Sequence, residues 1–507
     1  MNYSWSYQGG YQGAWNTMIR DVFSRDIQRD MGQPYTRSRF YHLYVNGVYW
    51  GVFQTQERPE ARYAASYFGG SSGDYDVVKV DASNGRYDVE ATDGSVDPWQ
   101  QVWSLCQEGF KSNSQYFKLQ GMNEIGEKSP DLPCLVNIDN LIDYMLIIFY
   151  TGNFDSPASK FMQNKAPNNY YAIYNHNRQD GFRFFVHDAE HTLITSPISP
   201  CEGIEEDRVN IGSRNDAYKM MVTSFSEFHP QWLHHRLTEN PEYRLRFADH
   251  VYRHFFNDGV FQPDYCMTAF MNRAFEIEDA IIAESARWGD AKINKPRTKD
   301  DDWLPAVDDI VDNFFPVRSD IVLRQLRQAD LYSTIDPPSF INNGSEIIAK
   351  NIEIGSDLSL EMVNPNADGV IYYTLDGSDP RQVGGAVSLS ALPDSDFVQL
   401  VIGSTLRLRA RVKVGDEWSA LHQLMITKDQ PLHHLKLTEI HYHPLDDGDV
   451  DGREFEFIEI KNCGHDSLDL AMLHFSAGID FIFAQQIIQA GEFIVLASNA
   501  AAFQQRY

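Results

Sequence analysis

The stretch that most constrains this chain is residues 152–193, which contain a predicted β-hairpin. Two short apolar runs, 170–174 and 182–186, are rich in aromatic and branched residues. A polar, glycine-containing turn at 175–181 joins them. This pattern is typical of two antiparallel strands. The density of aromatic residues indicates that the hairpin belongs to a core.

Acids and amides lie on both sides of this hairpin. Asp155 follows an apolar helical run, and Asp188 and Glu190 stand at i and i+2 where the second strand ends, so the last two side chains can point the same way. Asn168 and Asn169 directly precede the first strand. Their oxygens are the hard ligands that Mg²⁺ prefers, which indicates phosphoryl transfer. The alternative is that these acids are ordinary solvated loop residues.

The same residues resemble the CotH (spore coat protein H) kinase-like family. That family carries GN-x-D, an N-Y-Y-x-Y strand and a W-D-x-D-x-T-F strand end, and residues 152–155, 169–174 and 187–193 follow this order. The sequence departs from the pattern in four ways. His187 replaces the Trp, Glu190 replaces the second Asp, the last Tyr of the strand comes one residue late, and the gap before the strand is longer.

The resemblance implies an α+β, bilobal, atypical protein-kinase-like domain that uses ATP and Mg²⁺. It implies that Asp155 is the catalytic acid and that Asp188 and Asn169 hold the metal, with Glu190 as a further metal ligand. Because the strand Tyr comes late, Asn168 and Asn169 are hard to choose between. Glu190 in place of Asp moves a carboxylate by one methylene, which alters a site that needs near-octahedral geometry.

A second hairpin is predicted upstream, because Asn46 and Gly47 lie between alternating apolar residues. It leads to Glu57, and the next predicted strand, 75–80, carries Lys79. Burying an ammonium without a partner is costly, so Lys79 either extends to solvent or meets an anion. The family shows the same order of motifs. By that resemblance Lys79 contacts nucleotide phosphates and Glu57 orients it or assists the metal.

Apolar residues recur at helical spacing in four other parts of the chain, which predicts helices at 17–31, 98–108 and 138–150 and over most of 218–331. The polar, glycine-containing segment 81–97 is predicted to be a loop between lobes.

A chain of 507 residues is too long for one core and suggests two or three domains. We predict a kinase-like domain over residues 1–335. Two small all-β domains of Ig-like sandwich type are predicted after the break at Asp336, where prolines end the helices and the composition changes to short strands with tight turns.

Each of the two small domains resembles a known type of module. Residues 336–429 resemble the chitobiase C-terminal-type module through Y-Y-T-L-D-G-S-D-P at 372–380. Residues 430–507 resemble the lamin tail domain through T-E-I-x-Y-H-P and a later E-F-I-E-I-x-N segment. We expect this last domain to be truncated and the first to lack upstream strands, which makes the chain an internal piece of a longer protein.

Composition limits the partners. With 71 acids against 43 bases the net charge is −28, which argues against nucleic acid and against an anionic membrane surface. No apolar run is long enough to span a membrane, and the first residues lack a secretory signal. The five cysteines are scattered without C-x-x-C spacing, so cysteine-based zinc or redox chemistry is not expected, and most should be buried thiols.

A calcium site is a further candidate. Asp447, Asp449 and Asp451 with Gly452 fit the first half of an EF-hand loop, but Ile458 stands at the twelfth position, where a bidentate Glu is needed. The alternative is a solvated acidic turn.

The sequence therefore predicts a secreted or surface bacterial protein whose CotH-like domain transfers the γ-phosphoryl group of ATP to Ser or Thr of a protein substrate. The alternative is a non-catalytic pseudokinase that serves as an extracellular scaffold or cell-surface binding protein. The chitobiase-like module also suggests association with polysaccharide, and a carbohydrate-active enzyme is a further hypothesis that it supports.

Overall fold

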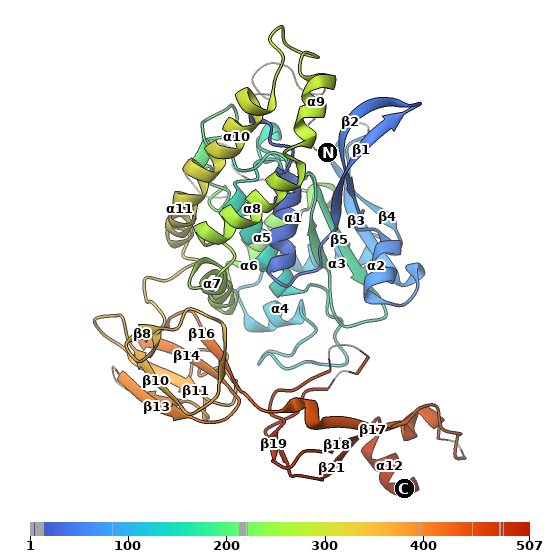
Figure 1. The fold of residues 1–507 in the computed structure, drawn as a ribbon, viewed down its shortest axis with the longest axis vertical. Coiled ribbons are helices and arrows are strands. Elements are labelled where there is room, and N and C mark those ends of the chain that lie inside the picture. The colour runs from blue at the N-terminus through green and yellow to red at the C-terminus, as the bar shows by residue number, and fades with distance from the viewer. Residues whose placement is uncertain are drawn as a thin grey trace. The chain divides into compact units, whose positions relative to one another are not determined.

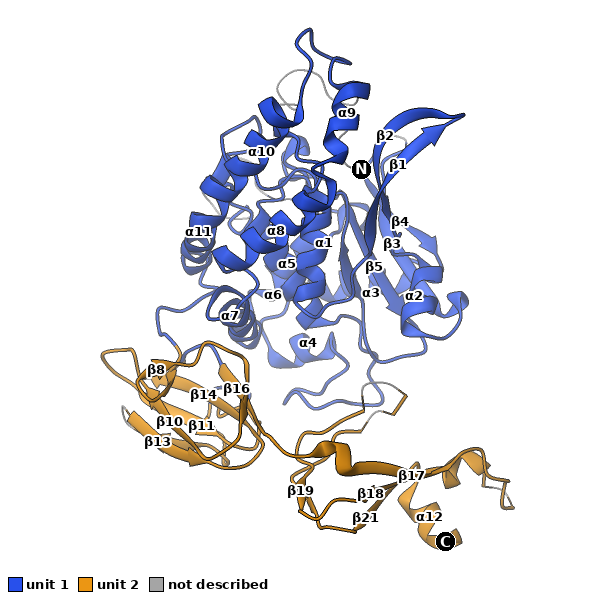
Figure 2. Cartoon of the chain, in the orientation of Figure 1, with its two compact units in different colours: residues 1–336, 383–385, 418–421 blue, residues 337–382, 386–417, 422–507 orange. Residues whose placement is uncertain are grey.

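The computed structural model divides the chain into two compact units (Figures 1 and 2). The first comprises residues 1–336 with the short segments 383–385 and 418–421, and the second comprises the remaining residues from 337 onward. The structure describes residues 5, 15–83, 85–211, 220, 222–394, 397–448, 450–475, 478–479 and 481–507.

A four-stranded antiparallel sheet lies at the centre of the first unit, in the order β4-β3-β5-β6. The hairpin predicted around residues 170–186 is confirmed as β5 and β6. One row of paired residues crosses all four strands. Lys79 pairs with Glu90 on one side and with Tyr171 on the other, and Tyr171 pairs with Phe185. The strands are β3 (Tyr75–Asp81), β4 (Asp88–Asp93), β5 (Tyr170–Asn175) and β6 (Arg183–Val186).

The prediction of a loop over residues 81–97 is wrong, because this segment supplies the edge strand β4. Its sequence alternates Val89 and Ala91 with polar residues, which suits a strand with only one apolar face. Pairing with β3 stabilises it through backbone hydrogen bonds between strands, which local composition does not reveal.

Other elements cover both faces of the sheet. Successive residues of a strand point to opposite faces, and here residues on both faces are buried. Val78, Ala172 and Phe184 on one face belong to the main core with helix α5 (Ile138–Thr151). Val77, Tyr171 and Phe185 on the other face pack with Tyr63 and Ala64 of α2 (Ala61–Phe68). Figure 1 shows the sheet between these two helices.

Helix α5 is almost wholly buried, as its apolar sequence requires. The side chain of Asn137 caps its start by accepting a hydrogen bond from the Asn140 N–H. Gly152 ends it in the left-handed conformation, with φ of 62°, which a glycine adopts without strain.

Helix α1 (Arg20–Asp30) packs beside α5 and closes the free edge of β6. The Gln28 side chain donates to the Phe184 carbonyl at 2.8 Å and accepts from the Val186 N–H at 3.1 Å. One amide thus satisfies both backbone groups that an edge strand would otherwise expose.

The remaining helices form the rest of this unit, and the predicted helices near 17–31, 98–108, 138–150 and 218–331 are confirmed for the residues that the structure describes. Single-turn π segments, Lys299–Trp303 and Ile310–Phe314, flank α10. None of the described helices is long and apolar enough to cross a membrane. The other helices are α3 (Asp97–Glu108), α4 (Asn113–Lys118), α6 (Pro230–Leu237), α7 (Pro241–Phe255), α8 (Pro263–Ile277), α9 (Ala280–Trp288), α10 (Leu304–Asp309) and α11 (Phe315–Gln328).

The upstream hairpin is confirmed as β1 (Ser38–Val45) and β2 (Val48–Gln56). Asn46 and Gly47 both have positive φ, 50° and 81°, as a two-residue hairpin turn requires. Helix α9 packs on β2, where a Glu284 carboxylate oxygen accepts a hydrogen bond from the Val52 N–H at 2.9 Å.

The second unit is rich in β-strands. Its first part contains a four-stranded sheet, β13-β10-β7-β8, and a six-stranded sheet in which β12-β11-β14-β16-β9 are joined by β15. Its last part contains β17-β18-β21, the pair β19-β20 and helix α12 (Ala500–Arg506). This composition is consistent with all-β domains, and their Ig-like and lamin-tail character stays a prediction. The strands are β7 (Ser339–Asn342), β8 (Ser345–Glu346), β9 (Asn351–Ile354), β10 (Leu358–Val363), β11 (Val370–Thr374), β12 (Leu392–Asp394), β13 (Phe397–Ile402), β14 (Leu406–Val414), β15 (Glu417–Trp418), β16 (His422–Lys428), β17 (Leu435–His441), β18 (Phe457–Asn462), β19 (Leu468–Asp469), β20 (Ile487–Ile488) and β21 (Phe493–Ala497).

The five cysteines are free thiols. Cys106, Cys201 and Cys266 are buried, as expected for most of them, whereas Cys134 is partly buried and Cys463 is exposed.

Candidate functional site

Asp155 lies in the turn that follows α5, and amide side chains hold its carboxylate. Oδ1 accepts from the Nδ2 of Asn168 at 3.1 Å and from the Ser159 hydroxyl, and Oδ2 accepts from the Nδ2 of Asn169 at 3.2 Å. The Asp155 backbone N–H donates to Asn153 at 3.1 Å. Asn168 and Asn169 therefore both contact Asp155, and the choice between them as metal ligand stays open.

Asp188 and Glu190 lie directly after β6, and Asp188 is close enough to Asp155 to interact with it electrostatically. The carboxyl groups of Asp188 and Glu190 share a hydrogen bond, and the negative charge of Asp188 raises the pKa of Asp155. Asp188 and Asn169 both have left-handed backbones, with φ of 51° and 47°, which Asp and Asn tolerate better than most residues. We call Asp155, Asn169, Asp188 and Glu190 the acidic site.

The pKa values follow from burial and from the crowding of negative charge. Burial raises the pKa of Asp155 to about 6, and the charge of Asp188 adds to this, although hydrogen bonds from Ser159 and Asn168 oppose it. Burial also raises the pKa of Glu190 far above its ordinary value, and the hydrogen bond and charge of Asp188 raise it further. Burial opposes ionisation of Asp188, but the hydrogen bond from Glu190 holds its pKa low.

The neighbouring carboxyl groups of Asp188 and Glu190 thus hold one proton between them. A divalent cation can take the place of that proton, because it offsets both negative charges. The donor set of two carboxylates and an amide oxygen consists of the hard oxygen ligands that Mg²⁺ takes.

Helix α1 holds the loop that carries these acids. The N–H of Ala189, between Asp188 and Glu190, donates to Asp21 at 2.8 Å. The Arg20 guanidinium donates to the carbonyls of Thr192 and Leu193. Asp21 and Arg20 could not be identified from the sequence, because polar positions on an amphipathic helix give no local signal of a partner so distant in the chain.

The family resemblance implies that Glu57 orients Lys79, but in the structure each of these two residues contacts other residues. The Nζ of Lys79 lies 3.0 Å from the Oε1 of Glu90, and the lysine side chain is 23% exposed. Glu57 accepts from the backbone N–H of Arg37 at 2.8 Å and from the Tyr67 hydroxyl. Glu90 was missed because its strand was predicted to be a loop.

Strand pairing relates Lys79 to the acidic site. Lys79, Tyr171 and Phe185 stand in one row and on one face of β3, β5 and β6. Neighbouring strands lie about 4.8 Å apart, so the Cα atoms of Lys79 and Phe185 are separated by roughly 10 Å. Strands β3 and β6 run in the same direction and end at the same edge, where Asp188 follows.

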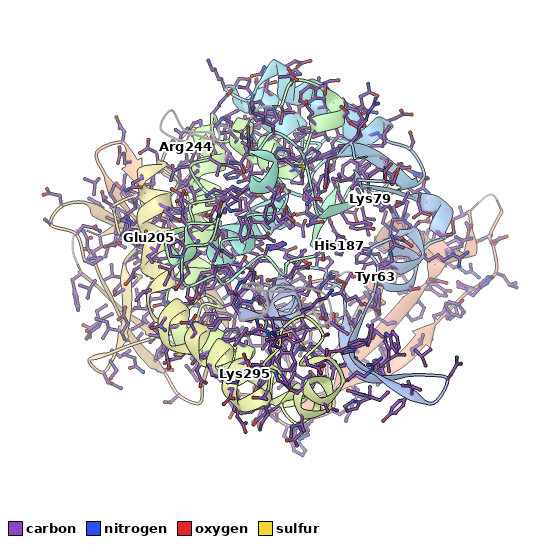
Figure 3. All side chains as sticks on the ribbon, turned by 90° about the horizontal axis from the view of Figure 1, so that it is seen from above. Tyr63, Lys79, His187, Glu205, Arg244 and Lys295 are labelled. Carbon is purple, nitrogen blue, oxygen red and sulfur yellow. The ribbon has the colours of Figure 1, made fainter. Side chains whose placement is uncertain are left out.

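His187 lies on this same face, with its ring centroid 4.8 Å from that of Tyr171 in an edge-to-face contact. Figure 3 shows Lys79, His187 and Tyr63 on one side of the molecule, away from Glu205 and Arg244. Burial lowers the pKa of His187 to about 4, and the charge of Arg25 adds to this. His187 is therefore neutral near pH 7 and acts as an aromatic packing residue where the family pattern has Trp.

The calcium candidate lies partly outside the described residues, because Asp449 is among those that the structure does not describe. The Asp451 carboxylate caps the following turn by accepting from the Arg453 N–H at 2.9 Å. The backbone of Asp447 pairs with Val450. Calcium binding at this turn stays a prediction.

The first unit is a mixed α/β fold in which buried and half-buried acids and amides gather near the end of strand β6. The sequence model of the family described as CotH kinase protein matches residues 4–313, which is more than half of the chain. The chain therefore belongs to the CotH kinase protein family.

No curated protein matches the chain. Among solved structures, a similarity is found to the Pseudomonas fluorescens alkylpurine DNA glycosylase AlkC bound to DNA containing an abasic site analog. The identity is 10%, the match covers 33% of this chain and 53% of that one, and the TM-score is 0.11, so it carries no argument.

Proposed function

We propose that the first unit is a Mg²⁺-dependent kinase that transfers the γ-phosphoryl group of ATP to a Ser or Thr hydroxyl of a protein, and that the chain acts outside a bacterial cell or at its surface. The observation that supports the reaction most directly is the meeting of Asp155, Asn169, Asp188 and Glu190 at the edge of the sheet. Membership of the CotH kinase family supports the same class of chemistry.

Asp188, Glu190 and the Asn169 side-chain oxygen would hold the magnesium ion. When bound, Mg²⁺–ATP supplies the phosphoryl group and neutralises the charge that develops on its oxygens. The Nδ2 atoms of Asn168 and Asn169 both donate to Asp155, so each amide leaves its oxygen for a metal, and we assign the ligand to Asn169 because the family resemblance implies it. The Asp21–Ala189 hydrogen bond fixes the loop from which the two acids extend.

Asp155 would orient the acceptor hydroxyl and take up its proton as the new oxygen–phosphorus bond forms and ADP departs. Its pKa, raised to about 6 by burial and by the charge of Asp188, suits a base that works near neutral pH. The donors on both carboxylate oxygens fix its orientation.

Lys79 would neutralise phosphate charge, and Glu90 would orient it through their 3.0 Å ion pair. We therefore assign to Glu90 the orienting role that the sequence resemblance gives to Glu57.

A pseudokinase is the second candidate, and a specific observation favours it. Glu190 stands where the family pattern has Asp, and burial, together with the hydrogen bond and charge of Asp188, raises the pKa of its carboxyl group so that it is protonated at neutral pH. A protonated carboxyl group does not ligate a metal, so an incoming cation must displace this proton.

A transfer assay with γ-labelled ATP on the full chain separates the two candidates. The kinase account predicts label on Ser or Thr of the chain or of an added protein. Asp155→Asn should bind Mg²⁺–ATP but transfer nothing, whereas Asp188→Asn should lose both activities. Nucleotide binding without transfer by the unaltered chain, to itself or to a panel of acceptor proteins, would favour the pseudokinase.

A further inference from the structure

A separate cluster of two histidines and an aspartate lies among the helices of the first unit. Asp143 comes from α5, and His250 and His254 lie one turn apart on α7. Their side chains are only 1%, 3% and 3% exposed. One ligand atom from each lies within 4.8 Å of the other two. A His pair at i and i+4 with a third donor opposite is a zinc-binding arrangement.

The donor atoms already point toward one another. The Oδ1 of Asp143 lies 2.6 Å from the Nδ1 of His250 and 3.1 Å from the Nε2 of His254. Imidazole nitrogen with carboxylate oxygen is a ligand set that suits zinc and its neighbours among the transition metals, rather than magnesium or calcium.

The groups around the cluster are those that usually support metal ligands. The Nε2 of His250 lies 2.9 Å from the Oδ1 of Asp139, and the Nε2 of Gln33 donates to the Oδ2 of Asp143 at 2.7 Å. A metal-bound His commonly donates its other N–H to a carboxylate, and a ligating carboxylate is commonly hydrogen-bonded as well. Both supports are present.

Hydrogen bonding without a metal is the competing account. In it, a charged His250 bridges Asp139 and Asp143, and His254 donates to Asp143. The buried Nδ1 of His254 finds no hydrogen-bond partner among the described residues in either account, so the metal content of the protein must distinguish the two.

We propose that Asp143, His250 and His254 bind a zinc ion. Three protein ligands leave one tetrahedral position for water. The ion would join α7 to α5 and, through Gln33, to the segment that follows α1. The cluster shares no residue with the acidic site, and the proposal does not depend on the proposed kinase activity.

The test has two steps. The zinc content of the full chain is measured after purification without chelator, and the bound metal is then replaced with Co²⁺ and the visible absorption spectrum recorded. We expect about one equivalent of zinc per chain and, after exchange, the visible absorption of tetrahedral Co²⁺. His254→Gln should lose both signals, and Asp139→Asn should weaken metal binding about 10- to 100-fold. His235→Gln, an exposed histidine on α6, and Asp188→Asn should keep both.

Two results would overturn the proposal. One is an unaltered chain that contains no zinc and gives no Co²⁺ absorption, which would leave a hydrogen-bonded ion pair. The other is a metal signal that survives in folded His254→Gln or disappears in Asp188→Asn. If His254→Gln does not fold, the unaltered chain and the Asp188→Asn variant still decide, because only a site away from Asp188 keeps its metal there.

Discussion

The Asp21 carboxylate accepts a hydrogen bond from the backbone N–H of Ala189 at 2.8 Å, so helix α1 fixes the loop between the two acids that we propose as metal ligands. Asp21 is completely buried, and Arg25 pairs with it at 2.7 Å. The pair therefore stabilises the fold and positions the acidic site at the same time.

Replacing Asp21 with Asn should destabilise the protein. The substitution keeps the shape of the side chain but leaves the buried Arg25 charge without its counterion. Breaking a buried pair in this way costs about 3 kcal/mol. Chemical denaturation of the full chain, followed by circular dichroism, measures this loss.

The matched control is Asp30→Asn at the end of the same helix. Asp30 pairs with the partly exposed Arg29, and such surface pairs contribute about 1 kcal/mol or less. Equal losses for the two variants would show that the Asp21–Arg25 pair has no special structural role.

Asp155→Asn should change how stability depends on pH when Mg²⁺ is absent. The folded protein binds the Asp155 proton more tightly than the unfolded chain does, because its pKa is raised from 3.8 to about 6. This contribution is fully present below pH 4 and is lost as the pH rises through 6. At 1.36 kcal/mol per pKa unit, the unaltered chain should lose about 3 kcal/mol relative to the variant between pH 4 and 7. Parallel stability curves would contradict the raised pKa.

Lys79→Met should weaken Mg²⁺–ATP binding by about tenfold or more, since one lost charge contact with phosphate is worth about 1.4 kcal/mol or more. Glu90→Gln should weaken it in the same direction, because it removes the 3.0 Å partner of Lys79. Glu57→Gln is the control, because Glu57 contacts Arg37 and Tyr67 instead. Fluorescence titration with a nucleotide analogue measures the three affinities. A larger effect from Glu57→Gln than from Glu90→Gln would restore the pairing that the family resemblance implies.

Gly181→Ala should destabilise the hairpin that precedes the acidic site. Gly181 has a φ of 69°, and a Cβ atom there would lie 2.6 Å from the backbone of Val136. Left-handed strain and the steric clash together should cost about 2–4 kcal/mol. Gly32→Ala has a similar φ of 79° but open space around it, so its cost should stay near 1 kcal/mol. Thermal melting of both variants compares them, and equal shifts would mean that the contact with Val136 relaxes freely.

Local sequence signals predicted the parts of the fold that local chemistry determines. The turn at Asn46 and Gly47 needs two positive φ values, and the hairpin of β5 and β6 is marked by aromatic runs on either side of a polar turn. Helix α5 is recognisable in the sequence because most of its residues are apolar, and nearly all of them are buried in the structure. The residues of the acidic site were recognisable because they lie directly before or after these elements in the chain.

Contacts between residues far apart in the chain could not be predicted in the same way. Nothing in the sequence of α1 indicates that Asp21 meets Ala189 or that Gln28 completes the edge of β6. Strand β4 looked like a loop because an edge strand with one apolar face has few apolar residues, and the partner of Lys79 was missed with it. The Asp143 cluster escaped notice because its aspartate and its histidines lie on two helices distant in the sequence.

Calorimetric titration of the full chain with ATP, with and without Mg²⁺, shows whether the acidic site holds the metal and the nucleotide together. We expect saturable binding that requires Mg²⁺, disappears in Asp188→Ala and is unchanged in Asp30→Asn. If the unaltered chain does not bind, or if Asp188→Ala binds equally well, the acidic site is not a Mg²⁺–ATP site.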